Sequence, residues 1–145
     1  MIGRLNLAVH KGCDGVDADN VDGYTNSTGF PLTGNDQLAY NRFLSAQAHS
    51  RKLAIGLKND IDQLDYLAVS FDFAVNEQCH EFNECAGYRA FTSLNKPVLN
   101  IEYQKRYVDN TNYAFNALCA KARSENLRTL VLPLLLDGSF RMSCD

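Results

Sequence analysis

Acidic side chains gather at the end of a short apolar run near the N-terminus. The run covers residues 15–18; Asp17 lies within it and Asp19 follows it directly. The turn-forming residues Asn20 and Asp22 come next. Because side chains two apart on a strand share a face, Asp17 and Asp19 are expected to point into one cavity. The pattern predicts a buried strand that carries two carboxylates to its C-terminal end, where they can serve as proton donors, bases or nucleophiles.

Four later apolar runs also end in polar or charged residues. The runs are 52–58, 71–75, 97–101 and 127–136, and their ends carry Lys58, Asn59 and Asp60, then Asn76, Glu77 and Gln78, then Glu102 and Tyr103, and finally Asp137 and Gly138. Segments with helical spacing precede and separate the runs, and helices are expected over 4–9, 35–50, 60–67, 83–94 and 112–126. Apolar strands that alternate with helices predict a parallel sheet in an α/β fold.

Two of the expected helices carry an apolar stripe that should face the core. The stripe residues are Ala39, Phe43 and Ala46 in the first helix, and Ala114, Ala117, Leu118 and Ala122 in the second.

Both a (β/α)8 TIM barrel and an open doubly wound sheet fit this order of elements. Polar residues at nearly every strand end favour the barrel, whose active sites lie at that face. No glycine-rich phosphate loop of the dinucleotide type follows any run. Because a full barrel takes about 250 residues, five strand-helix units predict an N-terminally truncated barrel that holds strands 4 to 8. No linker or low-complexity tract interrupts the chain, so residues 1–145 are expected to form one domain.

The bulk composition argues against several classes of protein. With 46% hydrophobic residues, a chain of 145 residues can build one core. The net charge of −3 argues against a nucleic-acid-binding protein, which needs a basic face. No apolar run approaches the roughly 18 residues of a membrane span, and the first residues lack the apolar stretch of a signal peptide. We expect a monomer.

Three blocks of sequence resemble the signature of a known enzyme family. The blocks are 11–24, 56–60 and 73–79, the last followed by Glu84 and Cys85. In this order and spacing they resemble glycoside hydrolase family 114, over essentially all 145 residues. The resemblance implies a (β/α)8 fold and a secreted or surface-exposed endo-α-1,4-galactosaminidase or a relative, acting on galactosamine-rich polysaccharide. One departure is Ala18, where the family often has proline.

The resemblance also implies a pair of catalytic carboxylates. In the family, a strand-end Asp and a strand-end Glu two strands later do the chemistry, and the matching positions are Asp19 and Glu77. Glycoside cleavage needs one ionised and one protonated carboxyl group, which we assign to Asp19 as nucleophile and Glu77 as general acid/base. Lys58, on the strand end between them, is expected to hold Asp19 ionised, whereas a less polar pocket would keep Glu77 protonated. A separation of about 5 Å predicts retention of configuration, and roughly 6.5–9.5 Å predicts inversion.

Further polar residues at the strand ends are candidate contacts for the substrate. They are Asp17, Asn20, Asp22, Lys58, Asn59, Asp60, Asn76 and Glu102 for hydroxyl and amino groups, with Tyr24 and Tyr103 for the faces of sugar rings. A deacetylated amino sugar is cationic, so acids at one mouth would attract it. The alternatives are cap or turn roles for Asp22 and Asp60, an internal charge partner for Lys58, and packing for the tyrosines.

The five cysteines predict two disulfides. Cys79 and Cys85 flank a short loop, and Cys119 and Cys144 can form the second bridge, which leaves Cys13 unpaired. Disulfides require an oxidising compartment, in agreement with the secreted or cell-surface location that the resemblance implies.

A zinc site formed by Cys79, His80 and Cys85 is the alternative for two of these cysteines. Adjacent Cys-His ligands suit tetrahedral geometry poorly, and the chain has no spaced CxxC pair. We expect neither a metal nor a cofactor.

Two classes of function stay open. The favoured one is the glycosidase, and the other is a carbohydrate-binding module or inactive relative that keeps the cleft without turnover. The presence of both Asp19 and Glu77 favours the enzyme, whereas the expected lack of the first three strands argues against activity of this chain alone.

Overall fold

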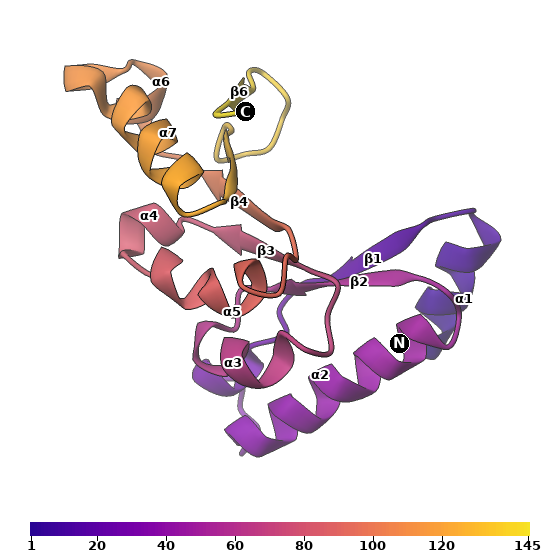
Figure 1. The fold of residues 1–145 in the computed structure, drawn as a ribbon. Coiled ribbons are helices and arrows are strands. Elements are labelled where there is room, and N and C mark those ends of the chain that lie inside the picture. Colours follow the sequence, from indigo (N-terminus) through magenta and orange to yellow (C-terminus); the bar gives the residue numbers. More distant parts are fainter. The chain divides into compact units, whose positions relative to one another are not determined.

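A computed structural model describes residues 1–145 as two compact units, Met1–Val75 and Asn76–Asp145 (Figure 1). The fold is α/β, as predicted. Six strands form a mostly parallel sheet in which the strand order follows the sequence from β1 to β6. No helix is both long enough and apolar enough to cross a membrane.

The first unit contains three parallel strands with helices between them. Its elements are α1 (Ile2–His10), β1 (Gly15–Ala18), the 3-10 turn Gly23–Thr25, α2 (Gly34–His49), β2 (Ala54–Lys58), the 3-10 turn Ile61–Gln63, α3 (Leu64–Leu67) and the beginning of β3 (Phe73–Glu77). Strand β2 pairs in parallel with β1 on one side and β3 on the other. Gly56 allows this close approach, because a Cβ there would lie 2.3 Å from the Phe73 ring.

A capping box starts α2 near the predicted residue. The Thr33 hydroxyl accepts the Asp36 N–H at 3.2 Å, and the Asp36 carboxylate accepts the Thr33 N–H at 3.0 Å. The helix predicted over 35–50 is therefore confirmed.

The apolar stripe predicted for α2 is wrong. Its three members, Ala39, Phe43 and Ala46, are exposed, and the buried face consists of Gln37, Asn41, Leu44, Ser45 and Ala48. Polar residues can occupy this face because other elements supply their partners. Asn41 donates to the Val21 carbonyl and to Asp60, and the Ser45 hydroxyl donates to the Ser70 carbonyl.

The second unit contains two further parallel strands and one short antiparallel strand. Its elements after β3 are α4 (Cys79–Phe82), the 3-10 turn Cys85–Tyr88, α5 (Arg89–Thr92), β4 (Val98–Glu102), α6 (Lys105–Val108), the 3-10 turn Thr111–Tyr113, α7 (Ala114–Ser124), β5 (Arg128–Val131) and β6 (Met142–Ser143). Strand β5 pairs in parallel with β4 and antiparallel with β6. Tyr107, Leu118, Cys119, Val131 and Cys144 form a buried cluster beside these strands.

Three predictions for this unit need correction. The helix expected over 83–94 is replaced by the 3-10 turn Cys85–Tyr88 and the short helix α5, and Asn83 before them ends α4 in the left-handed conformation with φ 60°. The strand expected over 127–136 ends at Val131, shortly before Pro133, which has no N–H for a ladder. In α7, Leu118 and Ala122 are buried as predicted, but Ala117 is exposed and Cys119 joins the buried face.

Candidate active site

Asp19 lies directly after β1, beside the last residue of β2. Lys58 ends β2 with 9% of its surface exposed, and its ammonium donates to Asp19 Oδ1 at 2.9 Å. The hydrogen bond from Lys58 holds the pKa of the exposed Asp19 carboxyl below its ordinary value. The structure thus places Lys58 where the sequence analysis expected it, and Asp19 is ionised at neutral pH.

Asp17 and Asp19 share a cavity, as their spacing predicted. The cavity has a volume of about 460 Å³, and Asn20 and Arg4 also contribute to its walls. Asp17, Asp19 and Asn20 are all exposed, so their polar groups are accessible to a ligand.

The carboxylate of Asp60 is buried behind the end of β2. Only 1% of the residue is exposed, and Asn41 donates to its Oδ2 at 2.9 Å while Oδ1 has no hydrogen-bond partner. Burial, together with the charge of Asp22, raises the pKa of Asp60 to about 7. Asp60 precedes a 3-10 turn, but its side chain makes no capping hydrogen bond. Asn59, the preceding residue, is partly exposed and has φ 50°.

Tyr24 stands among acids at the same end of the first unit. Burial, followed by the charges of Asp60, Asp62 and Asp22, raises its pKa. It lines a cavity of about 460 Å³ together with Tyr66 and Asp62. Asp22 precedes the 3-10 turn that contains Tyr24, and its carbonyl accepts a hydrogen bond from the Thr25 hydroxyl, so its turn role is observed.

Glu77 is the last residue of β3 and is partly exposed. The Tyr103 hydroxyl donates a hydrogen bond to Glu77 Oε1. The preceding residue, Asn76, is 1% exposed, and its amide is engaged by protein groups: it donates to the Tyr88 hydroxyl at 2.8 Å and accepts the Cys79 N–H at 3.0 Å. Of these candidates, Glu77 and Tyr103 are thus in direct contact, whereas Asn76 is buried and bonded to other protein groups.

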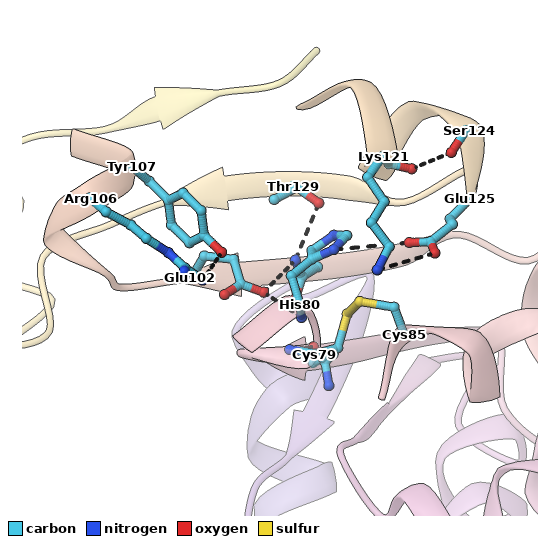
Figure 2. A network of polar contacts seen from close by, with 12 residues as sticks. Cys79, His80, Cys85, Glu102, Arg106, Tyr107, Lys121, Ser124, Glu125 and Thr129 are labelled. Carbon is cyan, nitrogen blue, oxygen red and sulfur yellow. Dashed lines mark hydrogen bonds and ion pairs between the residues drawn. A yellow bond between two sulfur atoms is a disulfide. The ribbon is translucent and has the colours of Figure 1, made fainter. Parts of the chain in front are cut away.

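Glu102 ends β4 and is fully buried, with 0% of its surface exposed. Its Oε1 accepts the backbone N–H of His80 at 2.9 Å and the side-chain amide of Asn100 at 3.2 Å (Figure 2). Burial raises the pKa of Glu102. Its contacts in the structure are therefore with the protein itself.

Three residues hold these strand ends in a role that the sequence did not predict. Asn41 ties α2 to Val21 and Asp60, Asn100 links Glu102 to the Thr129 hydroxyl, and His80 offers its backbone N–H to Glu102. A signal for Asn41 was present, because Gln37, Asn41 and Ser45 recur every four residues on one helical face.

Both predicted disulfides are present. Cys79 bonds to Cys85 and Cys119 bonds to Cys144, while Cys13 is free and exposed. The sulfur atoms of Cys79 and Cys85 and a ring nitrogen of His80 lie within 4.8 Å of one another. The two sulfurs are consumed by the disulfide, however, and a disulfide offers no thiolate to a zinc ion.

Comparisons with known proteins identify what the chain is similar to. The sequence model of glycoside hydrolase family GH114 matches residues 1–145. Aspergillus fumigatus Ega3, solved in complex with galactosamine, is 40% identical with a TM-score of 0.87, over 99% of this chain and 59% of Ega3. The glycoside hydrolase domain of PelA from Pseudomonas aeruginosa is 16% identical with a TM-score of 0.65, over 98% of this chain and 61% of that one. No curated protein sequence matches the chain.

The match to Ega3 confirms the predicted fold class. It superposes the chain on part of a TIM barrel and spans 59% of the length of that protein. The chain therefore corresponds to a portion of the barrel rather than to all eight strand-helix units.

Proposed function

Because the chain belongs to glycoside hydrolase family GH114, we propose that it acts as an endo-α-1,4-galactosaminidase, cleaving galactosamine-containing polysaccharide. The observation that carries this proposal is the 40% identity to Ega3, a structure that contains galactosamine. Residues 1–145 would then be part of one catalytic domain, and the protein would act as a monomer.

Asp19 is proposed as the nucleophile. A carboxylate that attacks an anomeric carbon has to be ionised, and the ion pair with Lys58 favours that form. Asp19 is also exposed beside the cavity that it shares with Asp17, so a sugar can reach it.

Glu77 is proposed as the general acid/base. The hydrogen bond from Tyr103 restrains the rotation of its carboxyl group, and an oriented acid transfers a proton to the leaving oxygen more effectively than a freely rotating one. In this assignment Tyr103 orients the carboxyl group of Glu77 and affects the substrate only by that means.

The acids of the first unit support a cationic substrate. Asp17 lies in β1, and Asp19, Asp22 and Asp62 lie in the segments that follow β1 and β2. Their combined negative potential would attract a deacetylated galactosamine unit, whose amine is protonated at neutral pH. The disulfides support an extracellular place of action, at the cell surface or in the medium.

The test is release of reducing ends from partially deacetylated α-1,4-galactosamine polymer by the protein expressed with its natural flanking sequence. The parent should release them, and Glu77→Gln should lower turnover by at least about a hundredfold, since general acid-base catalysis contributes 10²–10⁴. Glu84→Gln is the matched control, because it makes the same chemical change at a side chain that forms no capping hydrogen bond, and it should retain activity.

Two other outcomes would count against the proposal. Unchanged turnover by Glu77→Gln would remove Glu77 from the acid/base role. A folded parent that binds the polymer but releases no reducing ends would favour the carbohydrate-binding function instead.

A further inference from the structure

The turn that follows Glu77 adopts a strained backbone conformation. Gln78 has φ 64°, a left-handed value that is unfavourable for a residue other than glycine. Such a conformation persists only where the surrounding structure enforces it. Three successive N–H groups supply this restraint: Gln78 donates to the Ile101 carbonyl at 2.7 Å, Cys79 to the Asn76 side chain at 3.0 Å and His80 to Glu102 at 2.9 Å.

Glu102 is an unusual choice for the last of these acceptors. Its carboxyl group is fully buried, and burying a carboxyl group is unfavourable unless hydrogen bonds compensate. Oε1 has two donors, the His80 N–H and the Asn100 amide, whereas Oε2 has no hydrogen-bond partner. An apolar residue would suit the site better if filling the core were its only task.

Asn100 keeps Glu102 in place from the same strand. Its amide donates to Glu102 at 3.2 Å and to the Thr129 hydroxyl on β5 at 3.2 Å. The acceptor for His80 is thereby linked to two neighbouring strands, β4 and β5. Figure 2 shows Glu102, His80 and Thr129 in this network.

The side chain of His80 is also buried, which restrains the backbone of the residue that carries it. Only 4% of that side chain is exposed, and its Nδ1 lies 4.0 Å from Glu125 of the segment after α7. The Cys79–Cys85 disulfide constrains the residue immediately before it. The turn 77–80 is thus restrained at each residue that follows Glu77.

From this geometry we infer that Glu102 is a positioning residue for Glu77, acting through the backbone of His80 to hold the turn 77–80. The inference rests on the proposed catalytic role of Glu77. It replaces direct substrate contact as the role of Glu102, because a residue with 0% exposure is inaccessible to a sugar.

The experiment compares three substitutions of Glu102 in the protein with its natural flanking sequence. Glu102→Gln keeps an oxygen at the same reach, Glu102→Asp keeps the carboxyl group but withdraws the oxygen, and Glu102→Leu removes the acceptor. We expect kcat within about threefold of the parent for Glu102→Gln and a loss of about tenfold or more for the other two, with KM nearly unchanged in all three. Hydrogen exchange at the amides of Cys79 and His80 should accelerate by about tenfold in the same two variants.

Glu84→Leu is the control for an acid-to-leucine change on the neighbouring turn, and it should leave both readouts unchanged. If Glu102→Leu fails to fold, Glu102→Gln against Glu102→Asp still decides, because positioning predicts that Gln is the better substitute. Full kcat in Glu102→Asp, or unchanged exchange at His80, would overturn the inference. A parent without any turnover would instead refute the proposed function, while the exchange data would still report whether Glu102 holds the turn.

Discussion

The ends of β1 and β3 present their carboxylates in different ways. Asp19 is exposed, and the ammonium of Lys58, 2.9 Å away, sets its charge. Glu77 is partly exposed, contacts a neutral donor, Tyr103, and is followed by a turn with three hydrogen-bonded amides and a disulfide. The first site controls ionisation and the second controls position, as expected if one carboxylate attacks and the other transfers a proton along a defined direction.

The ends of two other strands, β2 and β4, each carry a buried carboxyl group. Asp60 receives the side-chain amide of Asn41 from α2, and Glu102 receives the backbone N–H of His80. Burial raises the pKa of both groups. The difference is that Asp60 is supported by one side chain, whereas Glu102 supports the main chain beside a candidate catalytic residue.

The largest expected effect is a pH dependence of stability that originates from Asp60. Its pKa is about 7 in the folded protein and near 3.8 in the unfolded chain, so the folded state binds the proton more tightly. The stability that Asp60 contributes is therefore fully present below the unfolded pKa and is lost as pH rises towards about 7, by roughly 4 kcal/mol at 1.4 kcal/mol per pKa unit. Urea unfolding of the parent and of Asp60→Asn across this range measures the effect.

Asp60→Asn should remove this contribution to the pH dependence of stability, because its amide does not titrate. Glu102→Gln should remove a second contribution of the same sign, since the pKa of Glu102 is also raised. A stability difference between the parent and Asp60→Asn that stays constant between about pH 4 and pH 7 would show that the fold does not raise the pKa of Asp60.

Removing each disulfide should affect stability and turnover differently. Removing Cys119–Cys144, which spans 25 residues, should lower the free energy of unfolding by about 3.5 kcal/mol, and removing Cys79–Cys85, which spans 6, by about 2 kcal/mol. Paired serine variants, followed by denaturant unfolding and reducing-end release, provide the measurement.

Turnover should respond in the opposite order. At a temperature where both variants are folded, only the loss of Cys79–Cys85 should reduce kcat, because that bridge constrains the turn after Glu77. Equal losses of kcat in both variants would remove the distinction between a positional and a general structural role.

The smallest expected change in stability concerns Lys58. Because Asp19 is largely exposed, Lys58→Met should change the free energy of unfolding by no more than about 1 kcal/mol. The pKa of Asp19 should rise towards its ordinary value, which moves the acidic limb of the pH–activity profile to higher pH.

Lys58→Arg is the matched control, since it retains a positive charge and should keep the acidic limb near its original position. An unmoved limb in Lys58→Met would show that a group other than Asp19 controls activity in acid.

The sequence alone determined the features that follow from local residue patterns and from the order of the elements along the chain. Apolar runs and turn formers located the five parallel strands, helical spacing located α2, and the cysteine positions indicated both disulfides. Strand order also placed Lys58 beside Asp19, because the ends of adjacent parallel strands meet at one edge of the sheet.

Only the tertiary structure decided which polar residues are buried. Local hydrophobicity predicted the wrong face of α2, because Asn41 and Ser45 find partners at Val21, Asp60 and Ser70, on other elements. The position of Glu102 at a strand end predicted a contact with the substrate, although His80 and Asn100 donate hydrogen bonds to its Oε1 in the core. The physical reason is that a polar group is buried where a distant segment offers a matching donor or acceptor, and that pairing is a property of the folded chain.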